Sequence, residues 1–179
     1  MKKALFFDRD GTLIRDVPYL SDPDRVSLFP DTKAVLSSAR EAGFLLFLLT
    51  NQSGIGRGYY TMEVVDAIHD KILSILNLGD DLFAGIKVAP ESPDQASNYR
   101  KPSPNYLLEM IDFHQLDPSQ TWMIGDRTSD IQAGLNAGVR VAGLQTSNLY
   151  NQEMDLLLKK NSSSGYPSLQ SLWDHISHQ

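Results

Sequence analysis

Ala4-Leu5-Phe6-Phe7-Asp8-Arg9-Asp10-Gly11-Thr12 is the stretch that decides the fold of this chain. Its apolar residues predict a buried strand over residues 3–8, and two acidic residues stand where that strand ends. Ligands of open α/β sheets bind at this carboxyl edge. Gly11 lets the chain turn away at once, so that both carboxylates can face one site. Two carboxylates this close repel each other unless a cation or a proton lies between them. The stretch therefore indicates a hard metal ion such as Mg2+ and one acid acting as a nucleophile.

The same arrangement of an apolar run followed by polar residues recurs twice along the chain. Taken alone, the first stretch also fits a polar strand end in an ordinary Asp-Gly turn. However, residues 44–49 are an apolar run that leads into Thr50-Asn51-Gln52-Ser53-Gly54, and residues 121–124 are another that leads into Gly125-Asp126-Arg127-Thr128-Ser129-Asp130. Arg100-Lys101-Pro102 lies between them, ahead of a helical pattern. Because parallel strands deliver their ends to a common edge, these segments predict one shared site.

Strands and helices are predicted to alternate along the chain. After a loop over residues 11–30, helices are expected at 31–43, 61–76, 103–114 and 129–137, and strands at 44–49, 85–89, 121–124 and 139–142. The signals weaken from residue 148, where 162–165 predict a loop before a short helix over 169–176. The alternation predicts an α/β fold, a doubly wound Rossmann-like parallel sheet with helices on both faces. The length suits a single domain over residues 1–179.

Composition and charge favour a compact enzyme over a nucleic-acid or membrane-binding protein. The net charge of −6 disfavours binding to nucleic acid or to an anionic membrane, and no apolar stretch approaches transmembrane length. Lys2-Lys3 precedes only four apolar residues before Asp8, which does not fit a signal peptide. The sequence has no cysteine, which excludes disulfides, a thiol nucleophile and thiolate metal sites. These features predict a cytoplasmic protein with no nucleic-acid or membrane partner.

Together the motifs resemble the haloacid dehalogenase superfamily of phosphotransferases over roughly residues 4–145. Residues 8–12 match its first motif, Thr50 its second, Lys101 its third, and Asp126 with Asp130 its fourth. Residues 50–59 and 100–102 resemble one branch of it, which contains the D-glycero-D-manno-heptose 1,7-bisphosphate 7-phosphatases and the histidinol-phosphate phosphatases. The resemblance implies a domain with a minimal cap or none, acting as a monomer on a small phosphate ester.

The resemblance also implies a role for each motif residue. Asp8 would attack phosphorus and form an aspartyl-phosphate, while Asp10 would protonate the leaving alcohol and then deprotonate the attacking water. Mg2+ would be held by Asp8, the backbone carbonyl of Asp10 and Asp126. Thr50 would hydrogen-bond a phosphoryl oxygen, and Lys101 would offset the charge of the phosphoryl group.

A further group of residues is expected to contact the substrate. Asp16 and Tyr19 fall where the heptose enzymes carry an Asp-x-x-Tyr substrate loop, and the guanidinium of Arg100 suits a second phosphate. Arg127 stands where those enzymes usually carry lysine. The expected substrate-binding set is Asp16, Tyr19, Asn51, Gln52, Ser53, Arg100 and Arg127. Asp130 is expected to orient Lys101 or a metal-bound water rather than to bind the metal.

The remaining conspicuous side chains are expected to be structural or exposed. Arg57 is interpreted as an exposed loop arginine and Trp122 as a core residue. The four histidines lie outside every motif and are expected at the surface: His69, His114, His175 and His178.

One segment departs from the branch pattern. Most heptose bisphosphatases and many histidinol phosphatases carry a Cys-Pro-His…Cys-x-Cys zinc loop just before Arg-Lys-Pro. Ala89-Pro90-Glu91 and Ser97-Asn98-Tyr99 stand in its place, so no structural zinc is expected. Packing is expected to hold loop 90–99 instead. Because that loop helps to shape the pocket entrance in the branch, its change leaves the substrate open.

Four functions are compatible with the sequence. The leading hypothesis is a Mg2+-dependent phosphatase of small phosphorylated metabolites, with a heptose 1,7-bisphosphate as first substrate and histidinol phosphate as second. A nucleic-acid 3′-phosphatase shares a stretch like Thr50–Ile55, although the acidic charge counts against it. A non-catalytic binding protein on the same fold is the fourth, and the presence of every expected catalytic residue counts against that one.

Overall fold

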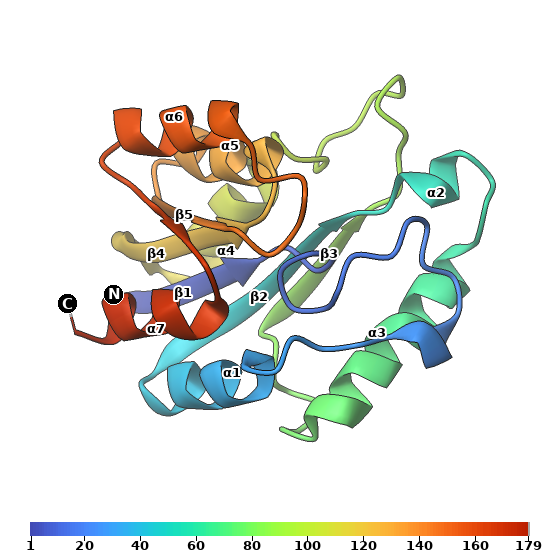
Figure 1. The fold of residues 1–179 in the computed structure, drawn as a ribbon, viewed down its shortest axis with the longest axis horizontal. Coiled ribbons are helices and arrows are strands. Elements are labelled where there is room, and N and C mark those ends of the chain that lie inside the picture. Colours follow the sequence, from blue (N-terminus) through green and yellow to red (C-terminus); the bar gives the residue numbers. More distant parts are fainter. Residues whose placement is uncertain (179) are drawn as a thin grey trace.

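Six parallel strands form one central sheet of the folded molecule in our computed structural model, which describes residues 1–178 (Figure 1). The strands are β1 (Lys2–Phe7), β2 (Phe44–Asn51), β3 (Gly85–Ala89), β4 (Leu116–Gly125), β5 (Arg140–Leu144) and β6 (Gly165–Tyr166). Their order across the sheet is β3-β2-β1-β4-β5-β6, so the chain reverses its direction of travel between β1 and β4. That reversal is the topological switch point at which open α/β sheets bind ligands.

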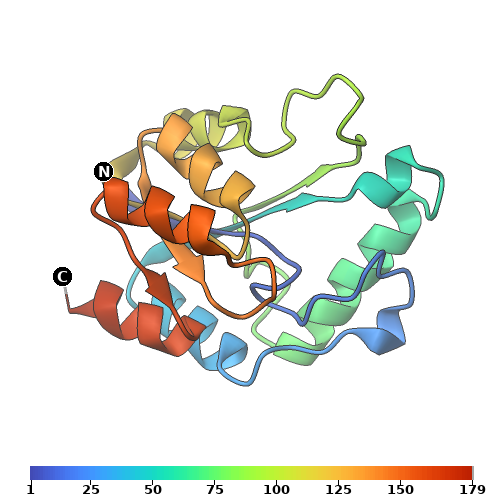
Figure 2. The same cartoon turned by 45° about the horizontal axis from the view of Figure 1, so that its top comes forward.

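Helices cover both faces of the sheet, which confirms the predicted doubly wound fold (Figures 1 and 2). One face carries α1 (Thr32–Glu41), α3 (Met62–Leu76) and α7 (Leu169–Ser177). The other carries α4 (Asn105–His114), α5 (Thr128–Asn136) and α6 (Gln152–Lys160). The short helices α2 (Ser53–Gly56) and η1 (Pro23–Arg25) lie in loops. No separate cap domain is inserted within residues 1–178; residue 179 of the expected single domain lies outside the described residues.

The apolar run of β1 supplies both hydrophobic cores. Side chains alternate along a strand, so Leu5 and Phe7 pack on the side of α1, α3 and α7, whereas Ala4 and Phe6 pack on the opposite side. All four are essentially inaccessible to solvent. A continuous apolar run is therefore what a central strand with two covered faces requires. Trp122 is buried in the first of these cores, which confirms its predicted place.

The C-terminal third holds two elements that the sequence did not lead us to expect. Helix α6 begins at an Asn151 cap, whose side chain accepts a hydrogen bond from the Met154 amide, and it buries Met154 and Leu158. Strand β6 is only two residues long and pairs with β5 at the edge of the sheet. Strand β4 also begins earlier than predicted, at Leu116, because its pairing with β1 shifts register before Thr121. None of the helices within residues 1–178 combines the length and the apolar composition needed to cross a membrane.

Candidate active site at the carboxyl edge of the sheet

The ends of β1 and β4 bring two acidic segments together. Asp8 follows β1 directly and stays tied to its neighbour, because its amide donates to the Ile124 carbonyl at 2.9 Å. Asp126 follows β4. Gly11 passes against Asp126 with a positive φ of 80°, and a Cβ at residue 11 would lie 2.2 Å from an Asp126 oxygen. Only glycine fits that backbone conformation and that close approach.

Lys101 lies at the centre of this cluster. Its Nζ atom is 2.5 Å from Asp8 Oδ1 and 2.7 Å from Asp130 Oδ1, and it also donates to the Leu49 carbonyl at 2.8 Å. All three charged side chains are buried. Burial by itself would lower the pKa of Lys101, but the charges of Asp130 and Asp8 outweigh it and raise that pKa. Lys101 is therefore a buried cation held between two carboxylates. We define Asp8, Lys101, Asp126 and Asp130 as the carboxyl-edge site.

Asn51 holds the backbone that carries Lys101. Its side-chain oxygen accepts from the Lys101 amide at 3.0 Å, and its side-chain nitrogen donates to the Lys101 carbonyl at 3.1 Å. This pair of bonds joins the end of β2 to a loop fifty residues further along the chain. The amide of Asn51 thus fixes the position of the cation.

The carboxylates of Asp8, Asp126 and Asp130 lie close enough for one cation, with one oxygen from each within 4.8 Å of the others. Asp126 Oδ1 is buried without a hydrogen-bond partner among residues 1–178, while Ser147 donates to its other oxygen. Burial, and next the charge of Asp8, raises the pKa of Asp126 to about 7. A buried oxygen without a partner is costly and is what a hard cation would satisfy.

Asp130 is already occupied by contacts of its own. Lys101 lies against Oδ1, and the Arg127 amide donates to Oδ2 at 3.0 Å. Burial raises the pKa of Asp130, against the opposing charge of Lys101. Within the cluster, Asp8 and Asp126 are therefore the carboxylates that best fit a cation, and Asp130 contacts the lysine.

Asp10 faces a different set of partners. Arg9 lies alongside it with a nitrogen 3.0 Å from Oδ2, and Gln52 donates to the same oxygen at 2.9 Å. Burial, only partly opposed by the charge of Arg9, raises the pKa of Asp10. A raised pKa suits a carboxyl group that must both give and take a proton. Metal binding through the backbone carbonyl of Asp10 stays a prediction.

Two adjoining hollows open onto this edge of the sheet. The smaller, of about 140 Å3, is lined by Asp8, Asp10 and Lys101 together with Arg100 and Arg127. The larger, of about 280 Å3, is lined by Asp16, Tyr19, Gln52 and Tyr60 among others. The two hollows share the residues Asp10, Asn51, Ser53 and Arg127. All seven residues expected to bind substrate thus line one or both of these hollows.

Thr50 and the loop 90–99 are positioned by polar contacts. Thr50 is buried at the end of β2, where its hydroxyl accepts from Gln52 at 2.7 Å, and it lines neither hollow.

In the loop, Ser97 donates to the Glu91 carboxylate at 2.8 Å, and Arg100 donates to the Glu91 carbonyl at 2.9 Å. Hydrogen bonds of its own therefore hold this loop, in addition to the packing that we expected.

The surface position predicted for His69 is wrong. Its side chain is buried on α3, and its Nε2 atom lies 3.4 Å from a nitrogen of Arg9. Burial, and next the charge of Arg9, lowers the pKa of His69 to about 4. Of the other histidines, His175 and His178 are exposed, whereas His114 is half-buried against Phe47. A histidine on the apolar stripe of an amphipathic helix was the available signal for His69.

Sequence reasoning also missed two hydroxyl groups beside the site. Thr146 donates to the Gly11 carbonyl, and Ser147 donates to Asp126. Both follow β5, so they repeat the arrangement of a buried strand that ends in polar residues. That pattern, applied to a fourth strand, would have found them. Arg57 is exposed, as predicted.

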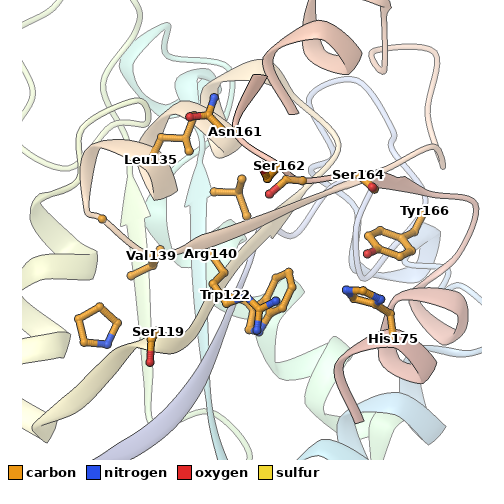
Figure 3. A pocket seen from close by; sticks show the side chains of 14 residues that line it. Ser119, Trp122, Leu135, Val139, Arg140, Asn161, Ser162, Ser164, Tyr166 and His175 are labelled. Atoms are coloured by element: carbon orange, nitrogen blue, oxygen red, sulfur yellow. The ribbon is translucent and has the colours of Figure 1, made fainter. Parts of the chain in front are cut away.

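A third hollow, of about 340 Å3, lies at the opposite, amino edge of the sheet (Figure 3). It is lined by the starts of β4 and β5, the segment 161–164 and α7. The guanidinium group of Arg140, which lines this hollow, lies over the Trp122 ring at 4.0 Å from the ring centroid. The two residues are direct partners in the register of β4 and β5, so the stack is a cross-strand pair. We refer to this region as the amino-edge hollow.

Sequence comparison places the chain among known hydrolases. A family model described as haloacid dehalogenase-like hydrolase matches residues 18–138. A D-glycero-beta-D-manno-heptose-1,7-bisphosphate 7-phosphatase of Helicobacter pylori (strain ATCC 700392 / 26695) is 39% identical over 140 residues, which cover 77% of this chain and 80% of the relative. A D-glycero-D-manno-heptose-1,7-bisphosphate 7-phosphatase of Chlorobaculum tepidum is 32% identical over 164 residues, or 84% and 81% of the two chains.

Structural comparison agrees with the sequence matches. The D,D-heptose 1,7-bisphosphate phosphatase from B. bronchiseptica, solved in complex with magnesium and phosphate, superimposes with a TM-score of 0.85. The match covers 98% of both chains at 25% sequence identity. The six-stranded sheet and its surrounding helices are thus those of a solved phosphatase.

Proposed function

The chain belongs to the haloacid dehalogenase-like hydrolase family and is a phosphoric monoester hydrolase, and from this premise we propose that it removes the 7-phosphate of D-glycero-D-manno-heptose 1,7-bisphosphate with the help of Mg2+. The observation that carries the proposal is the buried carboxyl-edge site, in which Lys101 lies between Asp8 and Asp130 beside the unpartnered oxygen of Asp126. The names of the relatives support the substrate. We take residues 1–179 as one catalytic domain.

The first half of the reaction uses Asp8 and Asp10. A carboxylate oxygen of Asp8 attacks phosphorus, the bond from phosphorus to the ester oxygen breaks, and an aspartyl-phosphate forms. Asp10, whose pKa is raised by burial, gives its proton to the leaving sugar oxygen. Lys101, 2.5 Å from Asp8, offsets the negative charge that the phosphoryl group brings to a buried position.

The second half returns the enzyme to its starting state. Asp10, now a carboxylate, takes a proton from a water molecule whose oxygen attacks phosphorus. The bond from phosphorus to the Asp8 oxygen breaks and inorganic phosphate leaves. The smaller hollow, at about 140 Å3, has room for a phosphoryl group beside these side chains. The larger hollow, with Asp16, Tyr19 and Arg127, would take the sugar.

Asp8 and Asp126 would hold the metal ion. The carboxylate oxygens suit Mg2+, which prefers hard oxygen ligands, and Asp126 Oδ1 has no other partner within residues 1–178. When bound, the ion supplies positive charge that screens the carboxylates from the phosphoryl oxygens. A structural zinc is not proposed, because the chain has no cysteine and Glu91, Ser97 and Arg100 tie loop 90–99 together.

Turnover of a substrate panel tests the proposal. The panel contains both anomers of the heptose 1,7-bisphosphate, histidinol phosphate and a 3′-phosphorylated oligonucleotide, each with and without Mg2+. We expect the highest kcat/KM for a heptose bisphosphate, loss of activity with EDTA and recovery with Mg2+. If kcat/KM is higher for histidinol phosphate or for the oligonucleotide than for the heptose bisphosphate, the proposed substrate is wrong. Absence of turnover with every compound would overturn the enzyme assignment. The monomeric state and the cytoplasmic location stay predictions.

A further inference from the structure

Gln52 has contacts that leave it no donor for a substrate. It is 4% exposed. Its Nε2 atom donates to Asp10 Oδ2 at 2.9 Å and to Thr50 Oγ1 at 2.7 Å. A side-chain amide nitrogen carries two hydrogens, so both are used. The expectation that Gln52 binds substrate does not fit these contacts, which instead link the proton-transfer residue of the first motif to the hydroxyl of the second.

Tyr60 decides which way the Gln52 amide points. The Tyr60 hydroxyl donates to Gln52 Oε1 at 2.7 Å, so the oxygen faces Tyr60 and the nitrogen faces Asp10. Tyr60 reaches this position because the chain folds back over Gly54. The Tyr59 amide donates to the Gly54 carbonyl at 2.8 Å, and a Cβ at residue 54 would lie 2.4 Å from the Tyr60 ring. The close approach explains the glycine.

The direction of the Gln52 amide also sets the direction of the Thr50 hydroxyl. Because Thr50 Oγ1 accepts from Gln52, its own hydrogen must point elsewhere. Within residues 1–178, no hydrogen bond in which Thr50 Oγ1 donates is formed. Thr50 is thereby left as a donor at the end of β2, which is the role that binding a phosphoryl oxygen requires.

Arg9 holds the other side of Asp10. Its guanidinium places Nε 3.1 Å from Asp10 Oδ2 and one terminal nitrogen 3.3 Å from Oδ1, while the other terminal nitrogen lies 3.4 Å from His69 Nε2. Arg9 is 1% exposed, and its guanidinium is engaged by Asp10 and His69. The fork of Arg9 and the amide of Gln52 therefore clamp one carboxylate from two sides.

We propose that Gln52, oriented by Tyr60, is a positioning residue that fixes Asp10 for proton transfer to the leaving group and presents Thr50 as a hydrogen-bond donor. Arg9, which contacts His69 of α3, braces the other side of Asp10. The proposal rests on the proposed phosphatase function, in which Asp10 protonates the leaving alcohol. It assigns Gln52 and Tyr60 to the positioning of Asp10 and Thr50 rather than to substrate recognition.

Leaving-group dependence tests the proposal. Phenyl phosphate and p-nitrophenyl phosphate have nearly the same shape, but phenol is the more basic leaving group and depends more on a positioned acid. For Gln52→Met we expect kcat/KM to fall about 100-fold with phenyl phosphate and less than about 5-fold with p-nitrophenyl phosphate, within the range for general acid catalysis. Tyr60→Phe, which removes one hydroxyl, should lower kcat/KM about 10-fold with phenyl phosphate and less with p-nitrophenyl phosphate. Tyr59→Phe is the matched control and should change neither value.

A double-mutant cycle identifies the residue through which Gln52 acts. In an Asp10→Asn background, Gln52→Met should cost less than about 3-fold with either ester, because neighbours that act together are not additive. Equal losses for the two esters, a change confined to KM, or full additivity with Asp10→Asn would overturn the proposal. These esters do not depend on the heptose, so a wrong natural substrate leaves the test intact.

The orientation of Asp10 gives a readout that needs no turnover. In a crystal structure of the Tyr60→Phe variant we expect the Asp10 or Gln52 side chain to change conformation. Both side chains in their wild-type positions would overturn the proposal, even if the protein hydrolyses neither ester.

Discussion

The two edges of one sheet carry hollows of very different character. The amino-edge hollow, at about 340 Å3, is larger than either of the two hollows described around Asp10 and Arg127. The guanidinium of Arg140 lies over the neighbouring Trp122 ring, and Ser119, Ser162 and Ser164 are exposed (Figure 3). The carboxyl-edge site is smaller, yet its four charged side chains are buried and one carboxylate oxygen has no partner within residues 1–178.

The difference teaches that unsatisfied buried charge, rather than volume, distinguishes the site that we propose for the chemistry. Burying a charge costs free energy unless partners compensate for it. At the carboxyl edge, Lys101 compensates for Asp8 and Asp130 but leaves Asp126 with a pKa raised to about 7. At the amino edge, the polar side chains face water and Arg140 acts as a cover for Trp122. Perturbed groups clustered in a cleft are the ones that enzymes use.

The largest expected effect belongs to Asp8. In Asp8→Asn the amide keeps the shape of the side chain but is no nucleophile, so kcat should fall by at least about 10³-fold while the fold persists. Steady-state kinetics and a thermal melt measure the two quantities. Retention of most of the wild-type kcat in protein free of contaminating phosphatase would remove Asp8 from the mechanism.

Removing Lys101 tests whether its buried charge is needed for folding as well as for rate. Lys101→Ala leaves Asp8 and Asp130 without their cation, so the free energy of unfolding should fall by about 3–5 kcal/mol and kcat by about 10²–10³-fold. Urea unfolding, with and without Mg2+, measures the first. Lys159→Ala is the control, because it breaks the exposed pair with Asp155 and should leave both quantities unchanged. A similar loss of stability in the two variants would contradict the contrast between buried and exposed charge.

His69 makes the carboxyl-edge side of the molecule sensitive to acid. Its pKa is lowered in the folded state to about 4 from 6.5, so below pH 6.5 the unfolded chain binds a proton that the folded chain refuses. The contribution of neutral His69 is therefore complete above pH 6.5 and lost as the pH falls to 4, by about 3 kcal/mol. The free energies of unfolding of wild type and His69→Gln, measured from pH 7 to 4, should converge by that amount. A pH-independent difference between them would show that His69 is not buried in its neutral form.

Arg100 tests how far the chemistry of the carboxyl edge extends toward the substrate. The side chain lines the smaller hollow and donates to the Glu91 carbonyl, and its fork retains further donors. Arg100→Ala should lower kcat/KM for the bisphosphate by about 1.5–3 kcal/mol, and for a small monophosphate much less. Steady-state kinetics with each substrate give the ratio of the two kcat/KM values in wild type and variant. Equal losses would make Arg100 a residue that only holds the loop.

The smallest effect is expected at the amino edge. Arg140→Met keeps the aliphatic part of the side chain but loses the charge over Trp122, so the free energy of unfolding should fall by about 0.5–1 kcal/mol. The kcat should not change, because the residue lies at the opposite end of the strands. A clear loss of kcat in a fully folded variant would break the distinction between the two edges.

Local patterns predicted the elements with strong periodicity. The apolar runs that became β1 and β2 and the stripes on α1 and α3 each lie within a residue or two of their predicted bounds. The two weakest elements were not predicted, because β6 forms only through pairing with β5, and α6 has only two buried residues. Pairing and burial of this kind depend on segments distant in the sequence, which no local window contains.

By itself, the sequence determined that acidic and polar residues follow three buried strands, and parallel strands must bring such residues to one edge. It therefore determined the fold class and the neighbourhood of Asp8, Thr50, Lys101 and Asp126. Only the tertiary structure decided which side chain contacts which. The Gln52 amide turned toward Asp10 and Thr50, and His69 turned inward toward Arg9. The physical reason is that hydrogen-bond direction and desolvation depend on atoms brought together by folding, whereas a motif records only order along the chain.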